Sequence, residues 1–143
     1  MTTLTPETVE QLRSAAIGAA ENAYAPYSNF RIGAALLFDN GSITTGCNVE
    51  NVSYGLTICA ERTALFRAVA EHGSAQRIDA VFVTNLNRAP SPPCGACRQV
   101  LSEFVTPHAV VYFFDGSAIV SKPFAELLPY AFSDWKTGHD ARG

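Results

Sequence analysis

Two short cysteine motifs constrain the fold of this chain more than any other feature. The first reads Cys-Ala-Glu over residues 59–61, and the second reads Pro-Cys-Gly-Ala-Cys over residues 93–97. The thiols of Cys59, Cys94 and Cys97 can supply three of the four ligands of a tetrahedral zinc ion. Structural zinc sites normally close with four protein ligands, whereas catalytic sites keep a place for water. The fold must therefore bring two distant segments together, with Glu61 beside the open position as a proton carrier.

Composition and charge narrow the class of protein. With 143 residues, the chain is expected to form one domain, residues 1–143, that can bury a substantial core. A net charge of -3 argues against a nucleic-acid-binding surface. No apolar run approaches the ~20 residues that cross a bilayer, and the first residues lack the features of a secretory signal. Four cysteines in this setting indicate metal binding in a reducing compartment, so we expect a cytoplasmic protein.

Apolar periodicity, caps and turn signals predict alternating helices and strands. Thr5 can cap the first helix, and the Asn40-Gly41 pair predicts a hairpin. The expected elements, in order, are a helix over Pro6–Ala23, strands over Arg31–Phe38 and Ser42–Asn48, a helix over Cys59–Glu71, a strand over Asp79–Thr84, a helix from near Cys94, a strand over Ala109–Phe114, an edge strand at Ile119-Val120 and a last helix from Pro123 to Leu128-Pro129.

This order predicts a three-layer α/β/α sandwich around a mixed five-stranded sheet. The alternation of strand and helix from Ser42 onward favours parallel pairing with right-handed crossovers. Cys59 then begins one crossover helix, and Cys94 and Cys97 lie at the start of the next. Both helix N-termini should meet beyond the carboxyl ends of their strands, where open α/β sheets bind ligands.

A buried zinc site with three thiolate ligands needs positive charge close to it. Zinc with three thiolates carries a net negative charge, which cannot be buried alone. Two helix N-termini supply about +0.5 charge each. Arg62 and Arg98 directly follow site residues, and both are expected to be able to donate hydrogen bonds to thiolate.

Two other interpretations of the cysteines are open. Cys47 could be a fourth ligand of a closed structural site, but it ends a predicted strand before a long loop, and His72, His108 and His139 are scattered. Redox chemistry at the Cys94/Cys97 pair would leave Cys59 and Glu61 without a role. A catalytic zinc site accounts best for the ligand count and the adjacent glutamate.

Longer segments of the chain resemble the small homotetrameric cytidine deaminases. The matching segments are Ala23–Leu36, Gly46–Asn51, Cys59–Ala64, Cys94–Val100 and Leu127–Phe132. The similarity extends over nearly the whole chain to about Ser133. It implies one Zn²⁺ per subunit, a nucleoside substrate, and hydrolytic deamination of cytidine and 2'-deoxycytidine in pyrimidine salvage. It also implies a homotetramer with shared active sites.

The resemblance further implies roles for single residues. Glu61 passes a proton from water to N3 of the base and later protonates the leaving amine, and Arg62 donates to the ligand thiolates. The substrate-binding residues implied by the family are Phe30 in the pocket, Asn48 and Glu50 on the ribose 3'-hydroxyl, the Ala60 backbone N–H on the base carbonyl, Tyr54 between subunits, and Phe132 stacked on the base of a neighbouring subunit.

One residue departs from the family pattern. Pro92 occupies a place where the family commonly has Ser or Thr, and it keeps the carbonyl that is expected to accept from the substrate amine. Another aminopyrimidine nucleoside, such as a nucleoside antibiotic, is the nearest alternative substrate. A polynucleotide-editing deaminase is disfavoured by the net charge of -3. A zinc or nucleoside-binding module without catalysis is the alternative of a different class. The segment after Trp135 carries no usable signal.

Overall fold

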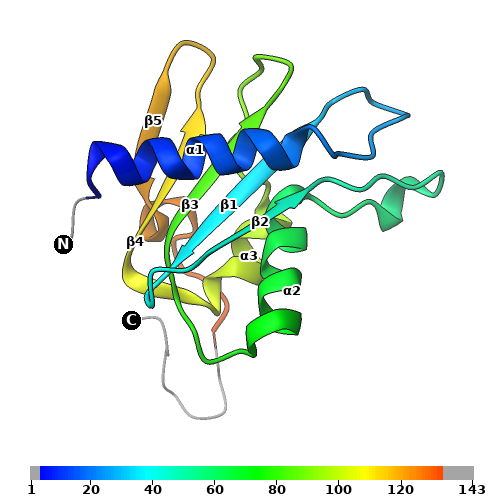
Figure 1. The fold of residues 1–143 in the computed structure, drawn as a ribbon. Helices are drawn as coiled ribbons and strands as arrows, with labels where there is room; N and C mark the ends of the chain where they lie inside the picture. Colours follow the sequence, from blue (N-terminus) through cyan, green and yellow to red (C-terminus); the bar gives the residue numbers. More distant parts are fainter. Residues whose placement is uncertain (1–3, 134–143) are drawn as a thin grey trace.

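A computed structural model describes residues 4–133, and the segment after Trp135 lies outside them. Within residues 4–133, one mixed five-stranded sheet of order β2-β1-β3-β4-β5 carries helices on both faces (Figure 1). The predicted three-layer α/β/α sandwich is therefore confirmed. The elements are α1 (Pro6–Ala20), β1 (Ile32–Phe38), β2 (Ile43–Cys47), the 3₁₀ helix η1 (Tyr54–Leu56), α2 (Ala60–His72), β3 (Ile78–Asn85), α3 (Gly95–Ser102), β4 (Val105–Phe114), β5 (Ile119–Pro123) and α4 (Phe124–Leu127).

The strand directions follow the predicted pattern with one difference. β1 and β2 form the expected antiparallel hairpin, in which Gly41 takes a positive φ of 86°. β3 and β4 pair in parallel, as the helix between them requires. β2 and β3 point the same way but are not neighbours, because β1 lies between them and pairs antiparallel with both.

Helix α1 covers one face of the sheet. The Thr5 side chain accepts a hydrogen bond from the backbone N of Thr8 at 3.2 Å, which confirms the predicted cap. Leu12, Ala16 and Ala20 are fully buried, and Leu12 and Ala16 belong to a core cluster with residues of β1 and β3. The helix ends three residues before the predicted Ala23, because the chain tightens into i→i−3 hydrogen bonds after Ala20.

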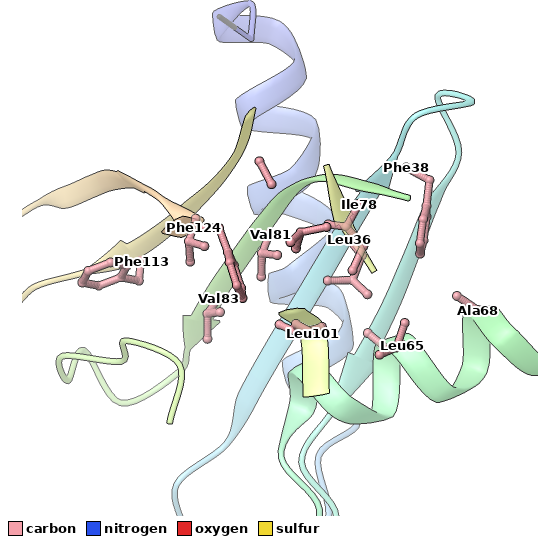
Figure 2. Packing of buried hydrophobic residues seen from close by; sticks show 14 residues of the cluster. Leu36, Phe38, Leu65, Ala68, Ile78, Val81, Val83, Leu101, Phe113 and Phe124 are labelled. Carbon is pink, nitrogen blue, oxygen red and sulfur yellow. The ribbon is translucent and has the colours of Figure 1, made fainter. Parts of the chain in front are cut away.

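The opposite face carries α2, α3 and α4 over the larger core. Figure 2 shows Leu65 and Ala68 of α2 and Leu101 of α3 directed toward Leu36 and Val81 on the sheet. Full burial of each large aliphatic side chain contributes about 1.5–3 kcal/mol relative to exposure. This packing fixes the two helices that carry the cysteine motifs.

The boundaries near the two motifs agree with the prediction, whereas those farther away differ. Cys59 is the N-cap of α2, and Cys94 is the N-cap of α3. β4 begins at Val105 instead of Ala109, because an irregular register between β3 and β4 accommodates Pro107. Within residues 4–133, no helix has the length and apolar character needed to span a bilayer.

Candidate metal centre and active site

Three sulfur atoms meet where α2 and α3 begin. The Sγ atoms of Cys59, Cys94 and Cys97 all lie within 4.8 Å of one another. The Cys59 and Cys94 sulfurs are 3.8 Å apart. A tetrahedral zinc ion with Zn–S bonds of about 2.3 Å separates its sulfur ligands by about 3.8 Å. The three side chains therefore fit a zinc ion in the arrangement in which the fold presents them.

The local backbone explains why cysteines occupy these positions. An N-cap side chain normally accepts a hydrogen bond from an N–H in the first turn of its helix. The Cys94 sulfur takes this part in α3, where it accepts from the backbone N of Cys97 at 3.5 Å. The first turns of α2 and α3 also bring partial positive charge to the sulfurs. Negative thiolates are thus stabilised where the two helices begin.

Arg62 supplies the predicted hydrogen bond to a ligand sulfur. Its Nη2 donates to Cys59 Sγ at 3.4 Å. Hydrogen bonding from Cys97 and from Arg62 lowers the pKa of the Cys59 thiol. The contact with Cys59 raises the pKa of Cys97, so the two sulfurs compete for one proton. A divalent cation held by both sulfurs replaces that proton and favours thiolate in each.

The corresponding prediction for Arg98 was wrong. Its Nε donates to the Pro93 carbonyl at 2.8 Å, and its Nη1 donates to the Leu127 carbonyl at 3.0 Å. The guanidinium is used in this way because two backbone acceptors lie within its reach. Arg98 thus contacts the chain next to the metal ligands, and its side chain donates to these two carbonyls instead of to sulfur.

Glu61 lies in the first turn of α2 and is 4% exposed. Burial raises the pKa of its carboxyl to about 7, although a hydrogen bond with Cys97 and the charge of Arg62 act in the opposite direction. A carboxyl group that is poised near neutral pH can both accept and release a proton. Its contact with Cys97 places it beside the sulfur cluster.

The other candidate ligands within residues 4–133 lie elsewhere, and His139 is outside the described residues. Cys47 faces Gly33 across the β1–β2 ladder and is not part of the sulfur cluster. His72 and His108 approach carboxylates, at 3.6 Å from Glu71 and 3.2 Å from Asp79. Among the residues that the structure describes, the cluster of possible metal ligands has three members. This count matches the open coordination of catalytic zinc sites.

Asn48 and Glu50, the predicted ribose-binding residues, lie at the end of the sheet that carries the sulfur cluster. Both side chains also form hydrogen bonds to neighbouring loops of the chain. The buried Asn48 side chain accepts from the backbone N of Ile32 at 2.9 Å and donates to the Phe30 carbonyl at 2.7 Å. The Glu50 carboxylate accepts from the backbone N of Tyr27 at 2.9 Å and from the hydroxyl of Ser28. An amide and a carboxylate have further donor and acceptor capacity beyond these contacts.

Aromatic side chains border a hollow next to Glu50. The hollow has a volume of about 200 Å³ and is lined by Tyr27, Ser28, Glu50, Tyr54 and Thr57. The Tyr27 and Tyr54 rings are tilted, with centroids 5.8 Å apart, and Tyr54 is 74% exposed. Tyr27 and Ser28 were not predicted as site residues, although both lie inside the segment that carries the family resemblance.

The remaining predicted residues differ in exposure. Phe30 is half-buried beside Asn48. Ala60 is the first residue of α2, so its backbone N–H has no acceptor within the helix. Phe132 is 72% exposed, and its carbonyl accepts from the side chain of Gln99 at 3.2 Å. Gln99 is a third residue that was not predicted as a contact, because a helical glutamine carries no signal for a partner 33 residues away in the chain.

Comparisons with known proteins agree on one family. Residues 6–113 match the model of the cytidine and deoxycytidylate deaminase zinc-binding region. The chain is 46% identical to a cytidine deaminase of Halalkalibacterium halodurans, over 87% of this chain and 93% of that protein. It is 44% identical to a cytidine deaminase of Mycobacterium tuberculosis, over 85% of this chain and 86% of that protein.

Solved structures give the same result. The crystal structure of a cytidine deaminase from Burkholderia pseudomallei is similar with a TM-score of 0.79 and 45% identity, covering 90% of this chain and 100% of that one. That of a cytidine deaminase from Mycobacterium tuberculosis has a TM-score of 0.76 and 41% identity, covering 87% of this chain and 97% of that one. The sulfur cluster, the buried glutamate and these matches together show that the chain belongs to the cytidine and deoxycytidylate deaminase family.

Proposed function

We propose that this protein catalyses the zinc-dependent hydrolytic deamination of cytidine and 2'-deoxycytidine in pyrimidine salvage. The products are uridine or 2'-deoxyuridine and ammonia. The observation that carries the proposal is the combination of three clustered thiols with a glutamate buried beside them. Membership of the deaminase family supports the same reaction.

The chemistry assigns one acid–base residue. When bound by Cys59, Cys94 and Cys97, zinc supplies a Lewis acid that lowers the pKa of water. Glu61 takes a proton from the attacking water and delivers it to N3 of the base. After the water oxygen has bonded to C4, Glu61 takes the second proton from that oxygen and delivers it to the amine, so that the C4–N bond breaks, the C4 carbonyl forms and ammonia leaves. Each proton that the carboxylate accepts is released again, so the enzyme ends the cycle unchanged.

Recognition of the nucleoside is assigned to the polar and aromatic residues around this centre. Asn48 and Glu50 are proposed to bind the ribose. Their hydrogen bonds within the chain use part of their donor and acceptor capacity, and the remainder is available to the sugar. The Ala60 N–H is proposed to contact the base carbonyl, and Phe30 to pack in the pocket. Arg62 supports the site through Cys59.

We also propose that the protein is a homotetramer with shared active sites. Tyr54 and Phe132, the two residues assigned to contacts between subunits, are 74% and 72% exposed. Large exposed apolar side chains that gather on one part of a surface are typical of interaction sites. Tyr24, Val52 and Leu56 are exposed on the same two loops as Tyr54 and Tyr27. Sedimentation of an active monomer would reject this assembly.

Two broader expectations remain proposals. Residues 1–143 are proposed to form a single domain, supported by the single sheet that spans Ile32 to Pro123. The protein is proposed to act in the cytoplasm, supported by four free cysteines, three of which need to stay reduced to bind metal.

A direct assay tests the proposed reaction. Purified protein is incubated with cytidine or 2'-deoxycytidine while ultraviolet absorbance, ammonia and bound zinc are measured. Turnover of both nucleosides by zinc-loaded protein is the expected result. Zinc-loaded, folded protein that converts neither nucleoside would contradict the proposal.

The alternative is the deamination of another aminopyrimidine nucleoside. The same assay with a panel of base-modified and sugar-modified cytidines separates the two. A member of the panel that is turned over far more efficiently than cytidine would favour the alternative.

A further inference from the structure

The loop that precedes the second metal-ligand motif has few hydrogen-bond donors of its own. Pro92 and Pro93 have no backbone N–H, so they cannot anchor the loop by main-chain donation. One end is fixed because the backbone N of Ser91 donates to the Phe114 carbonyl at 3.0 Å. The other end leads into Cys94 and needs a donor from elsewhere in the chain.

Arg98 supplies that donor from the first turns of α3. Its side chain reaches back to the Pro93 carbonyl at 2.8 Å, while its backbone N donates to the Cys94 carbonyl at 3.0 Å. Pro93 is fully buried, so its carbonyl is held in a region with little room for adjustment. A single residue therefore fixes both peptide groups next to the Cys94 ligand.

The same guanidinium also holds the end of α4. Its Nη1 donates to the Leu127 carbonyl at 3.0 Å. The last carbonyls of a helix have no partner within it, so this bond satisfies an acceptor that the helix leaves open. The next residue of α3, Gln99, donates to the Phe132 carbonyl at 3.2 Å. The segment from Leu127 to Phe132 is thus tied at both ends to the helix that carries Cys97.

We propose that Arg98 is a positioning residue that fixes the metal loop, Ser91–Cys94, and the C-terminal segment, Leu127–Phe132, relative to each other. A guanidinium suits this task because its planar fork offers several donors in fixed directions. The metal site of each chain is then built together with the aromatic residue that the same chain presents at its surface. The link from Phe132 to catalysis in a neighbouring subunit rests on the proposed function.

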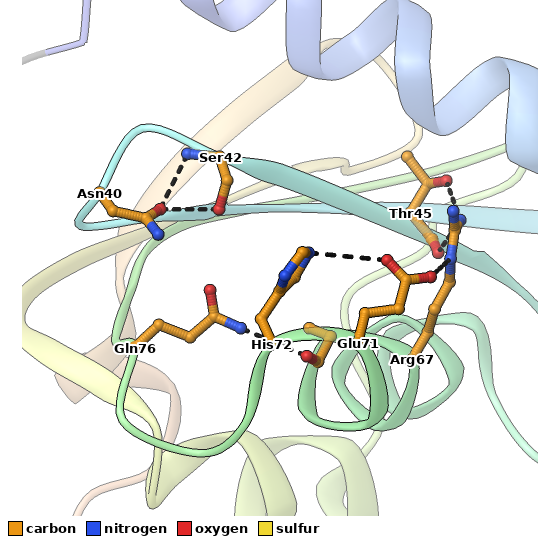
Figure 3. Close-up of polar contacts among 8 residues, drawn as sticks. Asn40, Ser42, Thr45, Arg67, Glu71, His72 and Gln76 are labelled. Carbon is orange, nitrogen blue, oxygen red and sulfur yellow. Dashed lines mark hydrogen bonds and ion pairs between the residues drawn. The ribbon is translucent and has the colours of Figure 1, made fainter.

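Two variants and a matched control test the proposal. Arg98→Ala removes both side-chain hydrogen bonds, and Arg98→Lys keeps the charge but lacks the fork that reaches two carbonyls. Arg67→Ala is the control. Arg67 lies on α2, where it donates to the Thr45 carbonyl at 3.3 Å and to Glu71 at 2.7 Å (Figure 3). Neither partner belongs to the sulfur cluster.

The first readout is the metal site itself. Zinc affinity is measured by competition with a chromophoric chelator, and the absorption spectrum is recorded with saturating Co²⁺. We expect Arg98→Ala to bind zinc about 10- to 100-fold more weakly, as for other residues that orient metal ligands. Arg98→Lys should show a smaller loss, both should alter the Co²⁺ spectrum, and Arg67→Ala should match the wild type.

The second readout is amide hydrogen exchange in the peptide 124–133. Exchange should accelerate in both Arg98 variants and stay unchanged in the control. Wild-type zinc affinity and Co²⁺ spectrum in folded Arg98→Ala would overturn the proposal. A metal defect without faster exchange in 124–133 would also overturn it, because the two segments would then be independent. If Arg98→Ala does not fold, the same criteria apply to Arg98→Lys.

Neither readout depends on turnover. Failure to deaminate cytidine would reject the proposed function and leave the metal and exchange data to decide the role of Arg98. Conversely, an active enzyme with a normal metal site in Arg98→Ala would reject only the positioning role.

Discussion

The two faces of the sheet share the same strands, but their helices point opposite ends toward the end of the sheet where the sulfur cluster lies. On one face, the C-terminal part of α1 lies over Gly33 at the start of β1. Its last turn exposes carbonyls with partial negative charge, and Arg31 donates to one of them, the carbonyl of Glu21. On the other face, α2 and α3 begin at the same end of the sheet, with Cys59 and Cys94 as their N-caps.

This difference explains why only one face holds the chemistry. Both faces bury apolar side chains, but the helix N-termini that stabilise thiolates converge on one face. The α1 face therefore contributes stability, whereas the opposite face contributes stability and the reactive groups. Substitutions on the two faces should therefore separate stability from metal binding and catalysis.

The largest effect is expected from Glu61→Gln. Glutamine preserves shape but cannot carry the proton, so kcat should fall by at least ~10²–10⁴-fold. Zinc content should stay at the wild-type level, because the three sulfurs are unchanged. Glu71→Gln, on the exposed part of the same helix, is the control and should keep wild-type rates. Steady-state kinetics with metal analysis checks both variants, and undiminished turnover by Glu61→Gln would reject its role.

The two faces can be compared directly through their close-contact glycines. A Cβ at Gly33 would lie 1.9 Å from the Ala16 carbonyl oxygen, and a Cβ at Gly46 would lie 2.4 Å from the Ala64 backbone N. Each alanine substitution must therefore displace a helix and should cost at least about 1–3 kcal/mol of unfolding free energy.

Zinc affinity should distinguish the two glycine variants. Gly46→Ala displaces α2, which carries Glu61 and begins at Cys59, so it should also weaken zinc binding. Gly33→Ala displaces α1 and should leave the zinc affinity of the folded protein near the wild-type value. Denaturant unfolding and chelator competition measure the two effects. Equal losses of zinc affinity in both variants would show that the faces are not separable in this way.

A more local effect is expected from Arg62→Ala. The variant removes the hydrogen bond to Cys59 Sγ, so zinc affinity should fall by about 10- to 100-fold while the fold persists. Circular dichroism and metal competition test this expectation. Wild-type metal content and turnover rate in this variant would show that Arg62 is a solvent-facing helix charge without a role in the metal site.

The smallest effect is expected at the start of α1. Thr5→Ala removes the cap at the backbone N of Thr8 and should cost about 1 kcal/mol of stability. Zinc binding should not change, because this cap is on the α1 face and at the helix end away from Gly33. Thermal unfolding with and without a chelator tests the prediction, and a zinc-dependent loss would contradict the separation of the faces.

The sequence predicted the metal end of the fold well because its signals are local. The helical patterns that follow the two motifs predicted helices beginning near Cys59 and Cys94, and both cysteines are found as N-caps. The hairpin at Asn40-Gly41 is equally local. Glu61 follows its ligand by two residues, so a single helical turn is enough to bring it beside the cluster.

The features that were missed depend on residues far apart in the sequence. Arg98 reaches Leu127, which lies 29 residues away, and no local pattern distinguishes this from a bond to sulfur. The position of β1 between β2 and β3 follows from pairing on both edges, which strand order along the chain does not specify. β4 begins at Val105, before the predicted Ala109, and an irregular register between β3 and β4 accommodates Pro107.

The coordination of the bound metal decides whether the three sulfurs form an open, catalytic zinc site. X-ray absorption at the zinc edge counts the sulfur ligands of the metal, which are expected to be Cys59, Cys94 and Cys97. Metal analysis of the purified protein gives the amount of zinc per chain. The account predicts one zinc per chain with three sulfur neighbours at about 2.3 Å and one lighter neighbour. Fully active protein without zinc, or a zinc ion closed by four protein side chains, would contradict it.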